Sequence, residues 1–333
     1  MIPLTQEFKK IFLGKKIKQT ILFLENSSLP EPAIQDIFKN FKIITQLAYS
    51  ENKYVKREVT HIYTRLSTII DEKFLTDYEQ LKFIGCPTTS NDHIQTELSS
   101  CKGIKLITIK DRKKLLKQIT STAELTTWLI IELSRNPSRY AKNVLDGNWD
   151  RYAHGNESLN GKTLGIIGMG RVGTQVARVF SDLGMKIIFF DVKKIKFSKY
   201  KKVSTIFKLA EQSDYITIHV NGNATNKNLI ESQFLSHLKA EGSYLINTSR
   251  GLVVNEEDII KSIKNGKLKG YATDVLINEQ TSDLKWLNDN PIWKEYTNEG
   301  KIIITPHIGG ATKDSLIKVD NFILTALSRS TAK

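Results

Sequence analysis

Residues 163–173 read TLGIIGMGRVG, and this stretch decides the fold. Residues 163–167 form a mostly apolar run of the kind expected for a buried strand, and the run leads directly into a glycine-rich turn, Gly168-Met169-Gly170-Arg171-Val172-Gly173. Apolar residues then recur at helical spacing at Val176, Ala177, Val179 and Phe180. A strand, a glycine turn and an amphipathic helix in this order predict the first unit of a dinucleotide-binding domain.

Each glycine of the turn has a mechanical role. Gly168 permits a tight turn, Gly170 lets the backbone approach a pyrophosphate, and Gly173 allows the helix to pack closely on the strand. The start of the helix, with Arg171 and Val172, offers free N–H groups and a positive dipole end to the phosphates. An ordinary glycine turn in an α/β protein is the alternative, and the flanking strand and helix argue against it.

The acid at the end of the next apolar run predicts the cofactor. Residues 186–190 end at Asp191, which lies eighteen residues after Gly173. A carboxylate there accepts hydrogen bonds from ribose hydroxyls and repels a 2′-phosphate. The sequence therefore predicts NAD rather than NADP, although Lys193 and Lys194 would soften the exclusion of NADP.

Apolar runs alternate with helix-like stretches along the whole chain, which predicts an α/β fold with parallel sheets covered on both faces. The runs before the glycine turn cover residues 20–24, 42–45, 61–64, 81–84 and 104–107. The later runs cover residues 163–167, 186–190, 215–218, 243–246, 270–273 and 302–304. Two such sets predict two doubly wound domains. Helical patterns from Ala123 onward and at residues 313–327 complete the organisation.

Three polar side chains follow predicted strands of the second set. Arg250 lies in the turn Asn247-Thr248-Ser249-Arg250-Gly251, and His307 follows residues 302–304. Ligands of open α/β sheets bind at the carboxyl ends of the strands, where an arginine can hold a carboxylate through two hydrogen bonds. Position alone fits a surface arginine equally well. Glu279 follows Asp274, and a histidine with a carboxylate partner is a candidate for the proton transfer that accompanies hydride transfer.

Residues 159–310 resemble the D-isomer-specific 2-hydroxyacid dehydrogenase family, and weaker similarity extends over nearly the whole chain. The matching segments are GKTLGIIG at 161–168, NTSRG at 247–251 and TPHIGG at 305–310. The resemblance implies that Arg250 binds substrate, that His307 is the acid/base and that Glu279 orients it. It also implies a cofactor site, whose further members are His219, Val220, Thr248, Ser249, Asp274, Gly309 and Gly310.

The resemblance also implies the domain arrangement. A Rossmann NAD-binding domain at residues 119–308 is inserted into a flavodoxin-like substrate domain made of residues 1–118 and 309–333, with the active site in the cleft between them. The connecting segment from Thr122 to Trp149 holds Trp128, Leu129, Ile131 and Trp149, more apolar surface than a linker needs, and the resemblance implies that it forms a homodimer interface. The chain ends about two dozen residues after Gly310, so no C-terminal regulatory domain is expected.

The implied reaction is hydride transfer between NAD and a small anionic D-2-hydroxy or 2-keto acid, with D-3-phosphoglycerate among the candidates. A substrate site is expected from Thr88, Thr89 and Ser90, whose loop follows a strand and resembles an anion nest. Arg65 is expected to contact a distal phosphate or carboxylate, although a surface salt bridge explains it as well. Alternatives are a glyoxylate/hydroxypyruvate-type reductase and an NAD(H)-sensing corepressor of the same fold.

Composition excludes several other classes. The chain has 49 basic and 35 acidic residues, a net charge of +14, but the lysines are scattered and no basic arm or zinc-finger spacing occurs, so no nucleic-acid partner is expected. The two cysteines, Cys86 and Cys101, fit neither a disulfide framework nor a metal site. No apolar run approaches membrane-spanning length, and no signal peptide is evident, which predicts a cytoplasmic protein without a membrane partner.

The sequence departs from the family pattern near the catalytic acid. Gln280 follows Glu279 where the family commonly has proline, Asn221 follows the His219-Val220 pair in place of another proline, and Ser90 replaces a typical glycine. These differences put the substrate and the local loop shapes in question, but they remove no catalytic group.

Overall fold

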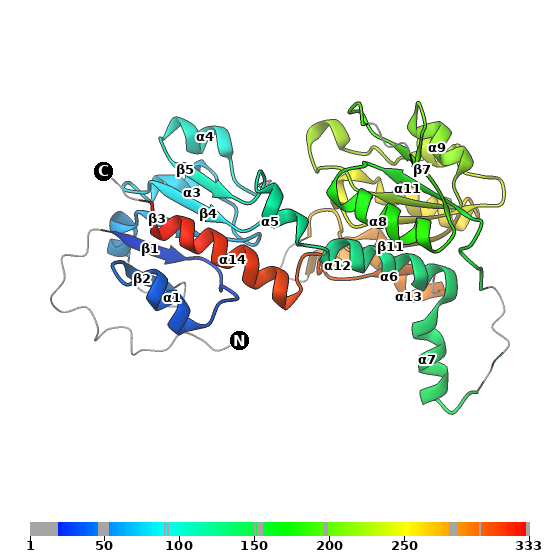
Figure 1. Cartoon of the computed structure of the whole chain (residues 1–333), viewed down its shortest axis with the longest axis horizontal. Coiled ribbons are helices and arrows are strands. Elements are labelled where there is room, and N and C mark those ends of the chain that lie inside the picture. Colours follow the sequence, from blue (N-terminus) through cyan, green and yellow to red (C-terminus); the bar gives the residue numbers. More distant parts are fainter. Residues whose placement is uncertain are drawn as a thin grey trace. The chain divides into compact units, whose positions relative to one another are not determined.

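A computed structural model describes residues 19–45, 53–89, 91, 93–149, 151, 156–195, 199–279, 285–299 and 301–330 of the chain. The chain divides into two compact units (Figure 1): Met1–Gln118 with Lys313–Lys333, and Ile119–Thr312. The chain thus returns to the first unit at Lys313, a few residues later than the border at 308/309 expected from the sequence.

The N-terminal unit is built on a five-stranded parallel sheet of order β2-β1-β3-β4-β5. All four residues of β1 are buried, as expected for a strand covered on both faces. Helix α14 packs against β4 and β5, and a Cβ on Gly85 would lie only 2.4 Å from Leu327 of that helix. The strands are β1 (Thr20–Phe23), β2 (Lys42–Thr45), β3 (His61–Tyr63), β4 (Phe83–Cys86) and β5 (Lys105–Thr108); the helices are α1 (Glu31–Ile37), α3 (Glu72–Thr76), α4 (Thr96–Cys101), α5 (Lys113–Lys117) and α14 (Lys313–Ser328), with a 3-10 turn at Lys53–Glu58.

The C-terminal unit carries a seven-stranded parallel sheet of order β12-β11-β10-β9-β6-β7-β8. The strand order reverses between β6 and β9, and such switch points are where open α/β sheets bind ligands. The strands are β6 (Thr163–Ile167), β7 (Lys186–Phe190), β8 (Lys201–Lys202), β9 (Tyr215–Ile218), β10 (Ser243–Asn247), β11 (Leu268–Thr273) and β12 (Ile302–Ile304).

Helices cover both faces of this sheet. On one face α6 and α8 pack through Leu129, Val176 and Phe180, and on the other α9, α10 and α11 pack through residues such as Leu209 and Phe234. The helices are α6 (Ser121–Arg135), α7 (Pro137–Leu145), α8 (Arg171–Asp182), α9 (Ile206–Gln212), α10 (Ser232–Ser236), α11 (Glu256–Lys264), α12 (Lys285–Asp289) and α13 (Pro291–Glu299), with short 3-10 turns at Ala224–Asn226 and Gly251–Val253.

The α/β class with two parallel sheets is confirmed. Five of the predicted strands coincide with β2, β6, β7, β9 and β12, whereas β4 begins two residues after the predicted run at 81–84. The two-residue strand β8 was not predicted. The predicted connecting helix is interrupted at Asn136, which takes the left-handed conformation at φ 47° and separates α6 from α7.

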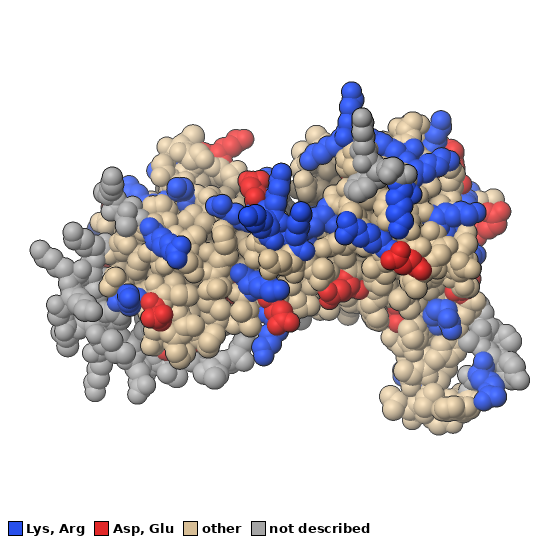
Figure 2. All heavy atoms as spheres, viewed as in Figure 1, with Lys and Arg blue, Asp and Glu red and all other residues tan. Residues whose placement is uncertain are grey.

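No helix in the described ranges is long and apolar enough to cross a bilayer. Within the same ranges, no group of three or more His, Cys, Asp or Glu side chains is arranged to hold a metal ion. Figure 2 shows Lys and Arg side chains spread over the visible face of both units, with Asp and Glu side chains among them. The visible surface of each unit therefore carries both positive and negative side chains, and the positive ones predominate.

Candidate active site

The glycine turn between β6 and α8 has the geometry that its sequence predicts. Gly168 lies at φ +94°, and a Cβ there would approach the His219 carbonyl oxygen to 2.5 Å. A Cβ on Gly173 would lie 2.3 Å from the Gly168 carbonyl oxygen, so the start of α8 rests directly on the turn. Any side chain at either position would force the backbone apart.

The start of α8 is open to an anion. Gly170 is the N-cap residue and supplies no side-chain cap, it is exposed, and a Cβ added to it would meet nothing within 4 Å. The first N–H groups of a helix have no partner within the helix and attract phosphate. The twelve-residue helix α8 and this exposed cap therefore fit the pyrophosphate of a dinucleotide.

Asp191 directly follows β7 and reaches the glycine turn. Its Oδ2 accepts a hydrogen bond from the Met169 amide at 2.9 Å, and its Oδ1 accepts one from the Lys193 amide at 2.8 Å. Each oxygen keeps a further lone pair, so the carboxylate can also accept from ribose hydroxyls. The Asp191 carboxylate therefore lies beside the glycine turn, and its contact with a ribose stays a prediction.

Arg171 is bound to the first residue of the C-terminal unit. Its guanidinium donates to the Ile119 carbonyl oxygen at 2.5 Å, and burial lowers the pKa of Arg171. Its neighbour Val172 packs against the apolar core formed with α6 and α8. The side chains of Arg171 and Val172 therefore serve packing, and their place in the cofactor site rests on their backbone N–H groups.

The histidine at the end of β9 does not fit proton transfer. Burial lowers the pKa of His219 to about 3, and its Nε2 lies 3.0 Å from the Thr217 hydroxyl. A group this far below neutrality is uncharged at physiological pH and is a poor proton donor. His219 and Val220 instead border the turn, since Gly168 approaches the His219 carbonyl and the Val220 side chain.

Arg250 lies in the turn after β10. The turn is held from within, because Asn247 Oδ1 accepts from the amide and the hydroxyl of Ser249, at 3.0 and 2.9 Å, while Asn247 Nδ2 donates to the Arg250 carbonyl. Thr248 is buried and its hydroxyl lies 2.9 Å from that of Thr126. The Arg250 guanidinium donates to the Ser249 carbonyl at 2.6 Å and is partly exposed.

His307 and Glu279 form the only histidine–carboxylate ion pair in the described part of the chain. His307 Nδ1 contacts Glu279 Oε1, and the two side chains are 29% and 31% exposed. Nε2 has no hydrogen-bond partner among the described residues, so it is available to a ligand. A carboxylate bound at Nδ1 fixes the orientation of the imidazole ring.

The loop that carries His307 is strained and clamped. His307 lies at φ 52°, which costs a non-glycine residue roughly 1–2 kcal/mol. The buried carboxylate of Asp274 holds the loop, accepting from Thr305 Oγ1 at 2.6 Å, the Ile308 amide at 2.8 Å and the Gly309 amide at 2.7 Å. Burial raises the pKa of Asp274, and the three hydrogen bonds oppose the rise.

The two glycines of this loop differ. A Cβ on Gly309 would lie 2.8 Å from Asp274 Oδ2, so glycine is needed for the clamp, whereas Gly310 is exposed with open space around it. In this structure Asp274 holds the loop that carries His307, a contact that the sequence did not suggest. Oδ1 of Asp274 accepts two of these hydrogen bonds and Oδ2 accepts one, and the expected role of Asp274 in the cofactor site stays a prediction.

Three polar residues therefore line one edge of the sheet. Arg250, Glu279 and His307 follow β10, β11 and β12, which are neighbours in the sheet. The carboxyl ends of parallel strands lie at the same edge, where this fold binds ligands. The structure brings Glu279 and His307 into contact, and their catalytic roles stay predictions.

The expected substrate residues of the N-terminal unit are partly engaged in internal contacts. Arg65 donates from Nη2 to Asp320 Oδ2 at 2.6 Å and to Ser28 Oγ at 3.1 Å, and from Nε to Tyr63 Oη at 3.0 Å. Asp320 is fully buried on α14. The ion pair with Asp320 is thus an internal one, not the surface salt bridge considered from the sequence.

The loop after β4 is described only in part. Thr88 Oγ1 lies 3.0 Å from the Cys86 thiol, and Thr89 is exposed. Ser90 lies outside the described residues. The anion nest expected at Thr88, Thr89 and Ser90 therefore stays a prediction.

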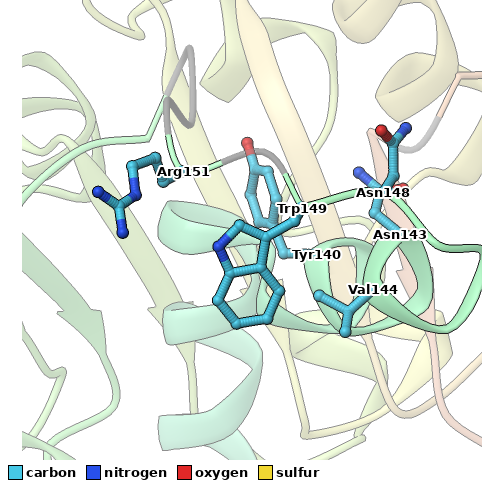
Figure 3. A pocket seen from close by; sticks show the side chains of 6 residues that line it. All are labelled: Tyr140, Asn143, Val144, Asn148, Trp149 and Arg151. Atoms are coloured by element: carbon cyan, nitrogen blue, oxygen red, sulfur yellow. The ribbon is translucent and has the colours of Figure 1, made fainter.

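A surface hollow lies beside α7. Figure 3 shows the side chains that line it: Tyr140, Asn143, Val144, Asn148, Trp149 and Arg151. Leu145, the last residue of α7, is 87% exposed, and Trp149, four residues beyond it, is 78% exposed. No residue of α7 is buried, which is unusual for a nine-residue helix in a monomer.

The chain matches a family model described as "D-isomer specific 2-hydroxyacid dehydrogenase, NAD binding domain" over residues 127–309. A putative D-3-phosphoglycerate dehydrogenase of Schizosaccharomyces pombe is 29% identical over 333 residues, covering 98% of this chain and 68% of its own length. D-3-phosphoglycerate dehydrogenase 2 of Saccharomyces cerevisiae is 30% identical over 277 residues, or 82% of this chain. This chain spans only 58% of the length of the latter relative.

Solved structures share the fold. A D-lactate dehydrogenase from Aquifex aeolicus, complexed with NAD and lactic acid, is 26% identical with a TM-score of 0.77, covering 92% of this chain and 93% of that one. A glyoxylate reductase from Paecilomyes thermophila has a TM-score of 0.76 at 22% identity, covering 92% of this chain and 93% of that one, which bears on the fold alone.

Proposed function

The chain belongs to the D-isomer specific 2-hydroxyacid dehydrogenase family, and from this premise we propose that it is an NAD-dependent dehydrogenase that interconverts a D-2-hydroxy acid and its 2-keto acid. The observation that carries the proposal is the ion pair of His307 with Glu279, which leaves Nε2 of the imidazole available beside the edge where Arg250 lies.

In the reducing direction, Arg250 binds the substrate carboxylate and polarises the adjacent keto oxygen. NADH, when bound, would supply the hydride that the keto carbon receives. His307 donates the proton on Nε2 to the keto oxygen, so the 2-keto acid gains one hydride at its carbon and one proton at its oxygen. Glu279 holds the imidazole ring in place during the transfer.

The cofactor proposed is NAD. Gly170 and the uncapped start of α8 would hold the pyrophosphate, and Asp191 would accept from the adenosine ribose. A 2′-phosphate would meet the Asp191 carboxylate, which favours NAD over NADP. Lys193 and Lys194 are exposed next to it and weaken the repulsion without removing it.

Two observations bear on the substrate class. The names of the relatives favour a phosphorylated acid, whereas the contacts of Arg65 favour an acid without a distal anion. Curated relatives carry the name D-3-phosphoglycerate dehydrogenase, whose phosphorylated substrate needs a cation for its distal anion. Arg65 is the expected cation, but its charge is matched by buried Asp320. We therefore favour a small 2-keto acid without a distal anion, as in the lactate or glyoxylate enzymes, and keep D-3-phosphoglycerate as the second candidate.

A homodimer is proposed from α7. Val144, Leu145 and Trp149 expose apolar side chains beside the hollow of Figure 3. Exposed apolar side chains on and beside a helix with no buried residue are typical of a subunit interface, and two-fold dimers are the commonest oligomers.

The test is NADH oxidation by the purified chain with a panel of 2-keto acids that includes glyoxylate, pyruvate, hydroxypyruvate and 3-phosphohydroxypyruvate. Turnover with any of them supports the dehydrogenase. NADH binding without turnover on the whole panel would instead favour the NAD(H)-sensing corepressor, since a sensor needs no proton donor.

A further inference from the structure

We propose that Glu256 is a positioning residue that holds the turn carrying Glu279, and so keeps the Glu279 carboxylate against His307. The inference rests on the proposed function, in which Glu279 supports the proton donor. The hydrogen bonds of Glu256 go to Ile277 and Asn290 and not to His307 or Glu279, so its effect on the reaction would pass through the backbone of the turn.

Glu256 joins two segments that are separate in the sequence. It is the first residue of α11 and is only 5% exposed. Its Oε1 accepts from the Ile277 amide at 2.7 Å, and its Oε2 accepts from the Asn290 side-chain amide at 2.7 Å. Asn290 in turn caps α13, with its Oδ1 accepting from the Trp293 amide at 3.0 Å. One carboxylate therefore ties α11 to the turn and to the start of α13.

The turn at residues 276–279 depends on external support. Asn278 lies in the left-handed region at φ 56°, where a non-glycine backbone is strained. The Leu276 amide donates to Glu279 Oε2 at 3.3 Å, a long bond that gives limited rigidity. At Leu276 the turn packs against Gly251. A Cβ added to Gly251 would lie 2.2 Å from the Leu276 carbonyl carbon. Ile277 is held by Glu256.

Burying the Glu256 carboxyl costs folding free energy, which argues that this residue does more than stabilise the fold. Burial raises the pKa of Glu256 to about 7, and the negative charges of Glu279 and Glu257 add to the rise. No cation forms an ion pair with Glu256 in the described part of the chain. A buried acid without a counter-charge is expensive, and such groups concentrate at functional sites.

A double-mutant cycle tests the proposal. Glu256→Ala should lower kcat by about 10- to 100-fold, the scale of loss when a catalytic group is misplaced by about an ångström, while NADH affinity stays within about two-fold. In a Glu279→Ala background the same change should cost less than about two-fold, because there is no carboxylate left to position. Equal losses in both backgrounds would overturn the proposal and leave Glu256 as a purely structural residue.

Two further variants guard against simple misfolding. Glu256→Gln keeps an acceptor for the Ile277 amide and should recover part of the kcat lost in Glu256→Ala. Glu257→Gln removes an equal charge from the neighbouring exposed position and should leave kcat unchanged. A loss in Glu257→Gln as large as in Glu256→Ala would contradict the positioning role, because it would trace the effect to charge.

A proton NMR measurement separates this proposal from the proposed function. The Nδ1–H of His307, bound to Glu279, should give a downfield resonance that disappears in Glu279→Ala. It should weaken or vanish in Glu256→Ala and persist in Glu257→Gln, whether or not any 2-keto acid is reduced. If it persists unchanged in Glu256→Ala, the positioning role is wrong even for an active enzyme; if the wild type turns over nothing, only the function fails.

Discussion

Replacing Arg65 with alanine separates a structural arginine from one that binds substrate. The change leaves Asp320, which is fully buried, without its cation, although Ser27 Oγ, the Ser28 amide and Tyr63 Oη still donate to it. Removing one partner of a buried ion pair costs about 3–5 kcal/mol, and the three remaining donors favour the lower end. For a unit of this size, a loss of about 3 kcal/mol lowers Tm by roughly 10 °C.

The assay pairs calorimetry with kinetics. Arg65→Ala should melt earlier while KM for glyoxylate or pyruvate stays within about two-fold, because Arg65 makes no contact with a small substrate in this account. Arg57→Ala is the matched control: its ion pair with Glu79 is 3.7 Å long, its side chains are 71% and 67% exposed, and Tm should barely change. An unchanged Tm in Arg65→Ala, with a KM for 3-phosphohydroxypyruvate raised more than about ten-fold, would refute the reasoning and favour the phosphorylated substrate.

Three other outcomes are expected. The ratio of kcat/KM for NADH over NADPH should exceed one, and Asp191→Ala should narrow it; equal or better use of NADPH by the wild type would count against NAD. Gly173→Ala should weaken NADH binding by at least about ten-fold, since its Cβ would lie 2.3 Å from the Gly168 carbonyl oxygen; wild-type affinity in this variant would show that the turn does not bind the cofactor. Light scattering should give a dimer that Trp149→Glu converts to monomer, and a wild-type monomer of about 38 kDa at micromolar concentration would exclude the α7 interface.

The sequence predicted the elements whose signal is local. Strand β6 and the glycine turn agree with the prediction because a central strand buried on both faces has only apolar choices, and the turn needs glycine at Gly168 and Gly173. Strand β4 was predicted two residues too early, because the apolar residue Leu81 was counted as part of the strand although it precedes it. Its side chain is buried in the core, while its amide closes a turn onto the Tyr78 carbonyl.

The candidate site could be predicted only where one residue carries the signal. His307, Glu279 and Arg250 follow strands and stand out by type, whereas Glu256 is the first of three consecutive acids that look equivalent in sequence. Only the packing of α11 buries that one and leaves Glu257 exposed.

The role of Arg65 depended on a partner that the sequence could not identify. Asp320 lies 255 residues farther along the chain, on α14, and no local pattern links the two. The same holds for Asp274, whose clamp on the His307 loop joins residues that are more than thirty positions apart. Contacts of this kind follow from the topology of the sheet and the return of the chain, and a sequence shows neither.

The proton transfer assigned to His307 is tested most directly by single-turnover reduction with His307→Gln and wild type, using the best 2-keto acid of the panel. The account predicts that the variant binds NADH with wild-type affinity and loses about 10²- to 10⁴-fold in the rate of NADH oxidation, the contribution typical of a general acid. A variant that binds NADH and reduces the keto acid at nearly the wild-type rate would contradict it.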